Sequence, residues 1–202
     1  ALPVPDLRLR PGLDVDGASE PRIDLAALAD VYGACTSLAY QSWANSNWGI
    51  YLARGDGSSP TRLTQNSAAD EAPSLGMGCQ LLAFASKRDG NYEIYTMRAD
   101  GSQAIRLTTS SNTDTLPSLS PTGSQIAYQS TESGANPDIY RIAVTGGSAT
   151  QLTTDSAYDG QPDWSPDGTK IAFISGRSGY KNVWVMDADG SDSRQVTTLT
   201  YA

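Results

Sequence analysis

The chain has 202 residues and a formal net charge of −8, because 22 Asp and Glu outnumber 14 Lys and Arg. This acidic character argues against binding to nucleic acid or to an anionic membrane surface, since both require a basic face. The sequence contains no histidine, which excludes Ser-His-Asp and Cys-His nucleophiles and histidine metal sites. The length allows one domain with a short appendage, and no apolar run is long enough to cross a bilayer.

We expect residues 1–27 to form an N-terminal extension or linker ahead of a repeated domain at 28–202. The stretch from Asp6 to Arg10 alternates polar and apolar residues, which is the period of a half-buried strand. Leu7 and Leu9 could belong to a strand donated to a sheet edge of the same or a neighbouring chain; the alternative is a linker from a removed domain. The chain begins at Ala1 without a basic and apolar leader, so we expect a processed or excised product.

Three short motifs then recur four times in register. The first motif is a triplet, and successive triplets are 44, 44 and 45 residues apart. The triplets are Leu38-Ala39-Tyr40, Leu82-Ala83-Phe84, Ile126-Ala127-Tyr128 and Ile171-Ala172-Phe173. Each triplet is followed by a hydrophobic pair, namely Ile50-Tyr51, Ile94-Tyr95, Ile139-Tyr140 or Val183-Trp184. The third marker is Leu63-Thr64, Leu107-Thr108, Leu152-Thr153 or Val196-Thr197. Three markers in register indicate a true internal repeat.

Each copy reads as short strands joined by tight turns. Asp56-Gly57, Asp100-Gly101 and Asp189-Gly190, with Gly146-Gly147 in the third copy, separate the second and third markers. Such dipeptides favour hairpin turns, because these turns need positive φ. Four antiparallel strands in a unit of this length are typical of a propeller blade. We therefore predict an all-β protein, a β-propeller built from four four-stranded antiparallel blades of about 44 residues.

The fourth copy carries a family resemblance in Pro162-Asp163-Trp164-Ser165-Pro166-Asp167-Gly168 and in Val185-Met186-Asp187-Ala188-Asp189-Gly190. These residues resemble the TolB-type, WD-like β-propeller repeat. The resemblance implies a propeller fold and a protein partner docked across one face in the cell envelope. It also implies rings of six or more blades, so four copies leave three arrangements open: closure at four, pairing of two chains, or stacking in an assembly.

The two cysteines occupy equivalent positions of the first two copies. Cys35 and Cys79 each lie four residues before the central alanine of the triplet, where the later copies have Gly123 and Gly168. Both therefore belong to the first hairpin turn of adjacent blades. A disulfide between them is favoured in an exported acidic protein; the alternative is two unrelated thiols in exposed turns.

An Asp-x-x-Pro motif precedes the first strand of three copies. Asp70, Asp114 and Asp159 could ring one mouth of a central channel and bind Ca²⁺ or a basic peptide terminus. The alternative, which we favour, is that each carboxylate caps backbone amides in a turn. The first copy has Ala26 at this place, which weakens the argument for a ring.

Trp43 and Trp48 flank an amide-rich loop in the first copy. They could form a contact surface for protein or carbohydrate, or pack over a blade edge. No catalytic constellation stands out, so we expect no enzyme and no cofactor. We predict an exported, extracytoplasmic module for protein binding or scaffolding. The alternatives are a self-assembling subunit of a surface layer or filament that donates its N-terminal strand, and a regulatory propeller from a peptidase.

Overall fold

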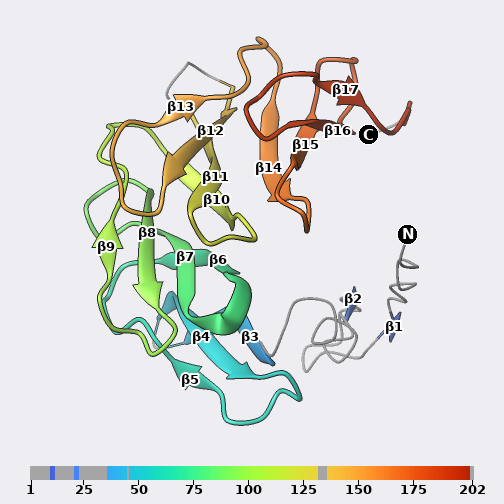
Figure 1. The fold of residues 1–202 in the computed structure, drawn as a ribbon. Helices are drawn as coiled ribbons and strands as arrows, with labels where there is room; N and C mark the ends of the chain where they lie inside the picture. The colour runs from blue at the N-terminus through green and yellow to red at the C-terminus, as the bar shows by residue number, and fades with distance from the viewer. Residues whose placement is uncertain (1–9, 12–20, 23–35, 45, 132–135, 201–202) are drawn as a thin grey trace.

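The computed structural model describes residues 10–11, 21–22, 36–44, 46–131 and 136–200. These residues form strands and turns, together with the single 3-10 turn η1 (Met77–Cys79). Figure 1 shows the chain as a succession of small sheets arranged along an arc. The all-β prediction is therefore confirmed for the described part of the chain.

Four sheets follow the order of the sequence, and we number them as blades 1 to 4. Blade 1 contains β3 (Ser37–Ala44), β4 (Asn47–Arg54) and β5 (Thr61–Arg62). Blade 2 contains β6 (Asp70–Leu75), β7 (Leu81–Ser86), β8 (Glu93–Arg98) and β9 (Ile105–Arg106). Blade 3 contains β10 (Asp114–Leu119), β11 (Gln125–Ser130), β12 (Asp138–Ala143) and β13 (Thr150–Gln151). Blade 4 contains β14 (Asp159–Trp164), β15 (Lys170–Ser175), β16 (Asn182–Asp187) and β17 (Arg194–Gln195).

Neighbouring strands within every blade pair antiparallel. Blades 2 to 4 have the four predicted strands, which we call A to D from the first to the last. Blade 1 shows strands B, C and D among the described residues, since its expected strand A lies outside them. In the N-terminal extension, β1 (Arg10–Pro11) pairs with β2 (Pro21–Arg22). The predicted donated strand with Leu7 and Leu9 lies outside the described residues and stays a prediction.

The core lies between successive blades. We call the side of a blade that faces the next blade its distal face and the other side its proximal face. The distal residues Ala83, Ile94 and Leu107 of blade 2 pack against the proximal residues of blade 3, which are Ile126, Tyr128, Tyr140 and Ile142. Blades 1 and 2, and blades 3 and 4, repeat this joint with the residues of the same markers. The hydrophobic residues of the sequence markers therefore form the two faces of the blades.

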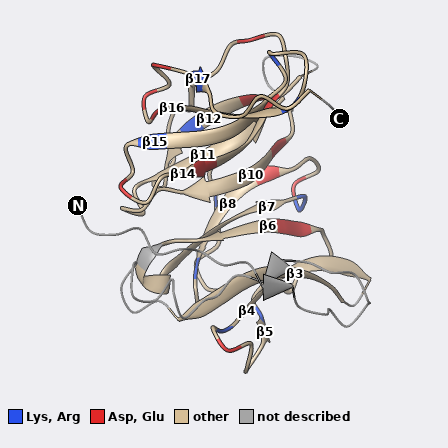
Figure 2. Cartoon of the chain, turned by 90° about the vertical axis from the view of Figure 1, so that its right-hand side faces the viewer, with Lys and Arg blue, Asp and Glu red and all other residues tan. Residues whose placement is uncertain are grey.

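The arc is open between its ends. Blade 4 packs on blade 3, and its strands make no extended contact with the described strands of blade 1. Figure 2 shows the blades stacked one on another from β3 to β17, with charged residues gathered at strand ends and in turns. Of the three arrangements left open by the sequence, closure at four is therefore not the one observed among the described strands.

Each A strand of blades 2 to 4 is interrupted by a bulge at the repeated Asp-x-x-Pro motif. The register shifts between Glu71 and Ser74 in blade 2, and at the same place in blades 3 and 4. Ala72, Leu116 and Gln161 lie in the bulges with φ of 51°, 52° and 55°. Proline follows each of them. A bulge tolerates proline because the residue there does not need to donate an N–H to the neighbouring strand.

Leu107→Ala should destabilise the chain by about 2–4 kcal/mol, because Leu107 is 8% exposed and fills the joint between blades 2 and 3. Ile105→Ala is the matched control, since Ile105 lies two residues away and is 56% exposed; its effect should stay below about 0.5 kcal/mol. Urea unfolding followed by circular dichroism measures both. Equal losses would contradict a core between the blades.

Candidate functional site

The turns between strands B and C lie at the same end of the blades as the segments that link one blade to the next. This follows from the antiparallel order, because strand A begins where strand B ends. We call this end of the arc the BC face. It collects the β3–β4, β7–β8 and β15–β16 turns and the linking segments 63–69, 107–113 and 152–158. The predicted Trp pair and the three predicted Asp residues all belong to this face.

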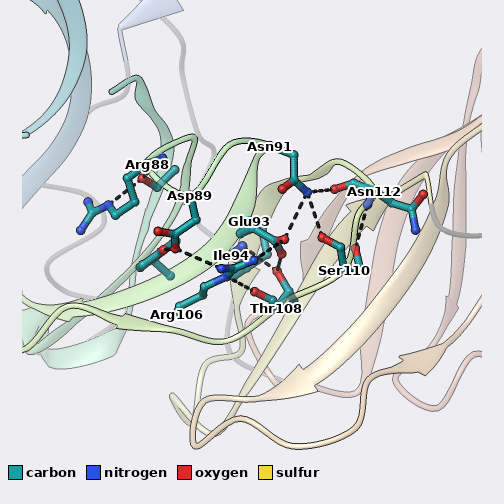
Figure 3. A network of polar contacts seen from close by, with 11 residues as sticks. Arg88, Asp89, Asn91, Glu93, Ile94, Arg106, Thr108, Ser110 and Asn112 are labelled. Carbon is teal, nitrogen blue, oxygen red and sulfur yellow. Dashed lines mark hydrogen bonds and ion pairs between the residues drawn. The ribbon is translucent and has the colours of Figure 1, made fainter. Parts of the chain in front are cut away.

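A buried carboxylate–hydroxyl pair joins strand C to the residue after strand D. In blade 2, the Thr108 hydroxyl donates to Glu93 Oε2 at 2.5 Å and accepts from the Ile94 N–H at 2.9 Å. Glu93 is fully buried, and Arg106 donates to its other oxygen at 2.8 Å (Figure 3). A buried charge with this many donors is compensated. The network fixes the base of the BC turn.

The same device recurs with different residues in the other blades. Thr153 donates to Asp138 at 2.9 Å in blade 3, and Thr197 donates to Asn182 at 2.9 Å in blade 4. In blade 1, Gly49 takes the place of the acid, and a Cβ there would lie 2.7 Å from the Arg62 guanidinium. The arginine fills the space that a side chain occupies elsewhere. Sequence reasoning missed this device, although the threonines are part of the third marker.

In blades 1 to 3, an asparagine in the BC turn or at the start of strand C ties this end of the blade to the neighbouring linking segment. Asn47 donates to the carbonyls of Asn66 and Ala68 at 3.0 and 2.8 Å. Asn91 donates to the carbonyls of Ser110 and Asn112 (Figure 3), and Asn136 donates to that of Ser156. The loops of the BC face are therefore held to one another by side-chain bonds, which preorganises this surface for a ligand.

The three predicted Asp residues begin strands β6, β10 and β14 and are buried. Arg88 donates to Asp70 at 3.1 Å, and Asn66 donates to its other oxygen at 2.6 Å. Arg177 donates to Asp159 at 2.5 Å. Burial raises the pKa of Asp159, while hydrogen bonds from Ser175 and Arg177 oppose this rise. Asp70 and Asp159 thus have internal cationic partners, and their role in binding a ligand stays a prediction.

The arginines of these pairs also stack on aromatic rings. The Arg88 guanidinium lies 4.6 Å from the centroid of Tyr95, and that of Arg177 lies 4.7 Å from that of Trp184. In the described part of the chain, no three acidic or thiol side chains lie close enough to hold one metal ion. The predicted calcium ion therefore has no assigned set of ligands and stays a prediction.

A cavity of about 370 Å³ lies where the A strands of blades 2, 3 and 4 meet. Its wall is formed by the bulges and the residues after them, which are Ala72, Pro73, Ser74, Leu116, Pro117, Ser118, Gln161, Pro162 and Asp163. The Ser118 hydroxyl of blade 3 donates a hydrogen bond to the Asp163 carboxylate of blade 4 at 3.0 Å. The predicted Asp residues precede this wall and do not line the cavity.

Trp43 and Trp48 form a cross-strand pair at the tip of the β3–β4 hairpin. Their rings meet edge to face, with centroids 5.6 Å apart. Trp43 is 60% exposed, whereas Trp48 is half-buried. An exposed indole ring that packs against a second, half-buried indole can serve as an anchor for a protein partner. The arrangement agrees with the predicted contact surface, and its role in binding stays a prediction.

Aromatic side chains recur along the BC face in other blades. Lys87 lies 5.8 Å above the ring of Tyr92, and Lys181 lies 3.9 Å above that of Tyr158. Tyr92 donates to Glu71 at 2.5 Å, and burial together with this bond raises the pKa of Tyr92 to about 12. Tyr180 is exposed. Sequence reasoning missed these tyrosines, because they lie outside the recurring markers.

Cys79 occupies the left-handed position of the first hairpin turn in blade 2. Its φ of 53° matches the 66° and 70° of Gly123 and Gly168, which confirms that the three residues are equivalent. Cys79 is disulfide-bonded. The other cysteine of the chain, Cys35, lies outside the described residues, so the pairing of Cys35 with Cys79 stays a prediction.

The comparisons with known proteins identify the blade type. The sequence model of the TolB beta propeller domain matches residues 114–201. A putative TolB from Agrobacterium tumefaciens superposes with a TM-score of 0.70 at 26% identity, over 79% of this chain and 60% of that chain. TolB from Acinetobacter baumannii gives a TM-score of 0.70 at 28% identity, over 80% and 41%. The chain thus spans less than two thirds of the length of each of these two structures.

Enzymes share the fold at lower identity. Dipeptidyl peptidase 4 from Porphyromonas gingivalis superposes with a TM-score of 0.61 at 18% identity, over 80% of this chain and 24% of that chain. This likeness concerns the fold alone. No curated protein sequence matches the chain. In the described residues, no helix is long and apolar enough to pass through a bilayer.

Arg177→Met should destabilise the chain by about 1–3 kcal/mol, because it leaves the Asp159 carboxylate buried without its cation. Arg98→Met, at an exposed position on strand C of blade 2, is the matched control and should change stability by less than about 0.5 kcal/mol. Urea unfolding compares them. If both variants unfold at the same midpoint, the Arg177 cation does not stabilise the buried Asp159 carboxylate.

Thr108→Val should cost about 1–3 kcal/mol, since it removes the donor to Glu93 and the acceptor for the Ile94 N–H. Thr108→Ser keeps the hydroxyl and should lose no more than about 1 kcal/mol for the missing methyl group. Thermal and urea unfolding distinguish the two. A serine variant as unstable as the valine variant would show that packing, and not the hydrogen bonds, sets the effect.

Proposed function

Because the chain is built from TolB-type β-propeller blades, we propose that it is a non-catalytic module that binds a protein partner through its BC face. The observation that carries the proposal is the 60% exposed Trp43, supported edge to face by Trp48. Tryptophan and tyrosine dominate the binding energy of protein interfaces when a partner covers them. Tyr180 adds a second exposed ring on the same face.

The fixed geometry of the BC face supports this role. Asn47, Asn91 and Asn136 bind the loops to one another, so little conformational entropy remains to be lost when a partner docks. The residues beneath the loops are already neutralised in pairs, as Glu93 is by Arg106 and Asp159 is by Arg177. Charged groups held in ion pairs of this kind stabilise the fold and are poorly suited to proton transfer. This supports a binding role rather than a catalytic one.

We place the module outside the cytoplasm. A disulfide-bonded Cys79 supports this address, because disulfides persist in oxidising compartments and are rare in the cytosol. The likeness to TolB structures also supports a location outside the cytoplasm, as a scaffold of the cell envelope. The chemistry of the BC face, which is aromatic and amide-rich with scattered lysines, suits a polypeptide with apolar anchor residues.

The test uses a displayed peptide library selected on the wild-type chain, followed by calorimetric titration of the enriched peptides. Trp43→Ala should weaken their binding at least tenfold, because an anchoring ring is lost. Thr122→Ala, in an exposed turn at the opposite end of the blades, is the matched control and should bind as the wild type does. Enriched peptides that bind equally to both variants would reject the BC face as the docking surface.

A further inference from the structure

Two lysines of the BC face carry a charge that no carboxylate of the described chain neutralises. Lys87 and Lys181 are exposed in the β7–β8 and β15–β16 turns. No ion pair joins either of them to an acid among the described residues. The arginines of the same turns differ, because Arg88 and Arg177 are each held by a buried Asp. The two lysines are therefore the cations that this face can offer to a ligand.

The acids of the BC face are already bound within the chain. Among its described residues, the exposed acids are Asp89 and Asp155. Asp89 accepts from Arg106 at 3.2 Å and from the Tyr95 hydroxyl, and Asp155 accepts from the Ala157 N–H at 2.9 Å. Although the whole chain has a net charge of −8, this face combines acids that have donors with two cations that lack a carboxylate. Charge complementarity therefore favours an anionic group on the partner.

Each of these lysines lies over a tyrosine ring. The ammonium nitrogen of Lys87 lies 5.8 Å from the ring centroid of Tyr92, and that of Lys181 lies 3.9 Å from the ring centroid of Tyr158. An aromatic ring attracts an ammonium group but does not neutralise its charge. The ammonium N–H groups that are not directed at the ring remain donors for an acceptor on a partner.

The two tyrosine rings are themselves held through their hydroxyls. Tyr92 donates to Glu71 of β6 at 2.5 Å, and Tyr158 donates to Gln129 of β11 at 3.1 Å. Gly160 makes room for the second contact, because a Cβ there would clash with the Tyr158 hydroxyl. A lysine over a ring that is bonded to a neighbouring strand thus occurs twice on the BC face. This arrangement orders each cation before a partner binds, so that less entropy is lost on binding.

The position of these lysines does not depend on where the described chain ends. Lys87 and Tyr92 belong to blade 2, which has a described blade on either side. Lys181 lies over Tyr158 in the segment that links blades 3 and 4, so this site also lies between two described blades. Both lysines lie in turns at the strand ends, and a blade that follows along the arc packs on the faces of the sheets instead.

We propose that the partner of the BC face is an acidic polypeptide segment, whose carboxylates bind Lys87 and Lys181 while an apolar residue covers Trp43. This inference rests on the proposed function and names the chemistry of its partner. Trp43 and Lys87 occupy equivalent positions of adjacent blades, one residue after Ser42 and Ser86. A segment that crosses from blade 1 to blade 2 therefore passes from the apolar anchor to the first cation.

Peptides enriched from the displayed library on the wild-type chain test this inference. They should contain more Asp and Glu than the input library, and their affinity should fall as NaCl is raised from about 0.05 M to about 0.5 M. The variant with both Lys87→Gln and Lys181→Gln should bind about fivefold more weakly in calorimetric titration. Lys170→Gln is the matched control and should bind as the wild type does, because Lys170 is exposed at the opposite end of blade 4 and pairs with Asp187.

A double-mutant cycle tests the contact itself. When the acidic residues of an enriched peptide are replaced by their amides, the double lysine variant should cause no further loss, because the carboxylates that the lysines bind are gone. Circular dichroism establishes that every variant is folded. A loss of affinity that is equally large for the acidic and the amide peptide would reject the carboxylate contact.

The same titrations separate this inference from the proposed function. Enriched peptides without an excess of acids, which lose affinity with Trp43→Ala and bind the double lysine variant as they bind the wild type, would keep the BC face as the docking surface and overturn the acidic partner. Peptides that bind Trp43→Ala as they bind the wild type would instead reject the proposed function.

Discussion

Every blade of this chain is a sheet with two apolar faces, and covering both faces is the constraint on which the rest of the structure depends. A sheet of three or four short strands has too little core of its own to be stable in water. Blades 2 and 3 meet the constraint inside the chain, since their faces carry fully buried residues such as Ile94 and Ile126. Blades 1 and 4 meet it on one side among the described residues. The shape of the arc, the position of the core and the exposure of apolar residues at its ends all follow from this requirement.

Polar groups in the structure serve the same arrangement. The buried acids of strands A and C lie at strand ends, where an arginine or a threonine compensates each of Glu93 and Asp159. Because the compensating groups come from other strands and turns of the same blade, they fix the strand register that places the apolar faces correctly. The bulge at Ala72 and its equivalents then shifts the pairing register within the A strands of blades 2 to 4. The BC face inherits its rigidity from these contacts.

The fold was predictable from the sequence because a repeat reports the same environment several times. Leu82, Ile126 and Ile171 recur at spacings of 44 and 45 residues, and all are fully buried. The sites were less predictable. The Asp-x-x-Pro motif indicates a turn, but the arginines that bind Asp70 and Asp159 are 18 residues away along the chain, in the turn between strands B and C. The exposure of Val196 could not be read from its own repeat position, because the equivalent Leu107 and Leu152 are buried.

The packing of each blade on its immediate neighbours makes the molecule a short one-dimensional lattice. In such a lattice, stability is the sum of terms for single units and terms for adjacent pairs, so opening spreads inward from the ends. Amide protons of β7, β8, β11 and β12 should exchange most slowly, whereas those of β4 and β16 mark the first steps of unfolding. A partner that caps one end would slow exchange there most of all and progressively less towards the other end. The arc would then transmit the presence of a neighbour along its length without any change in its mean structure.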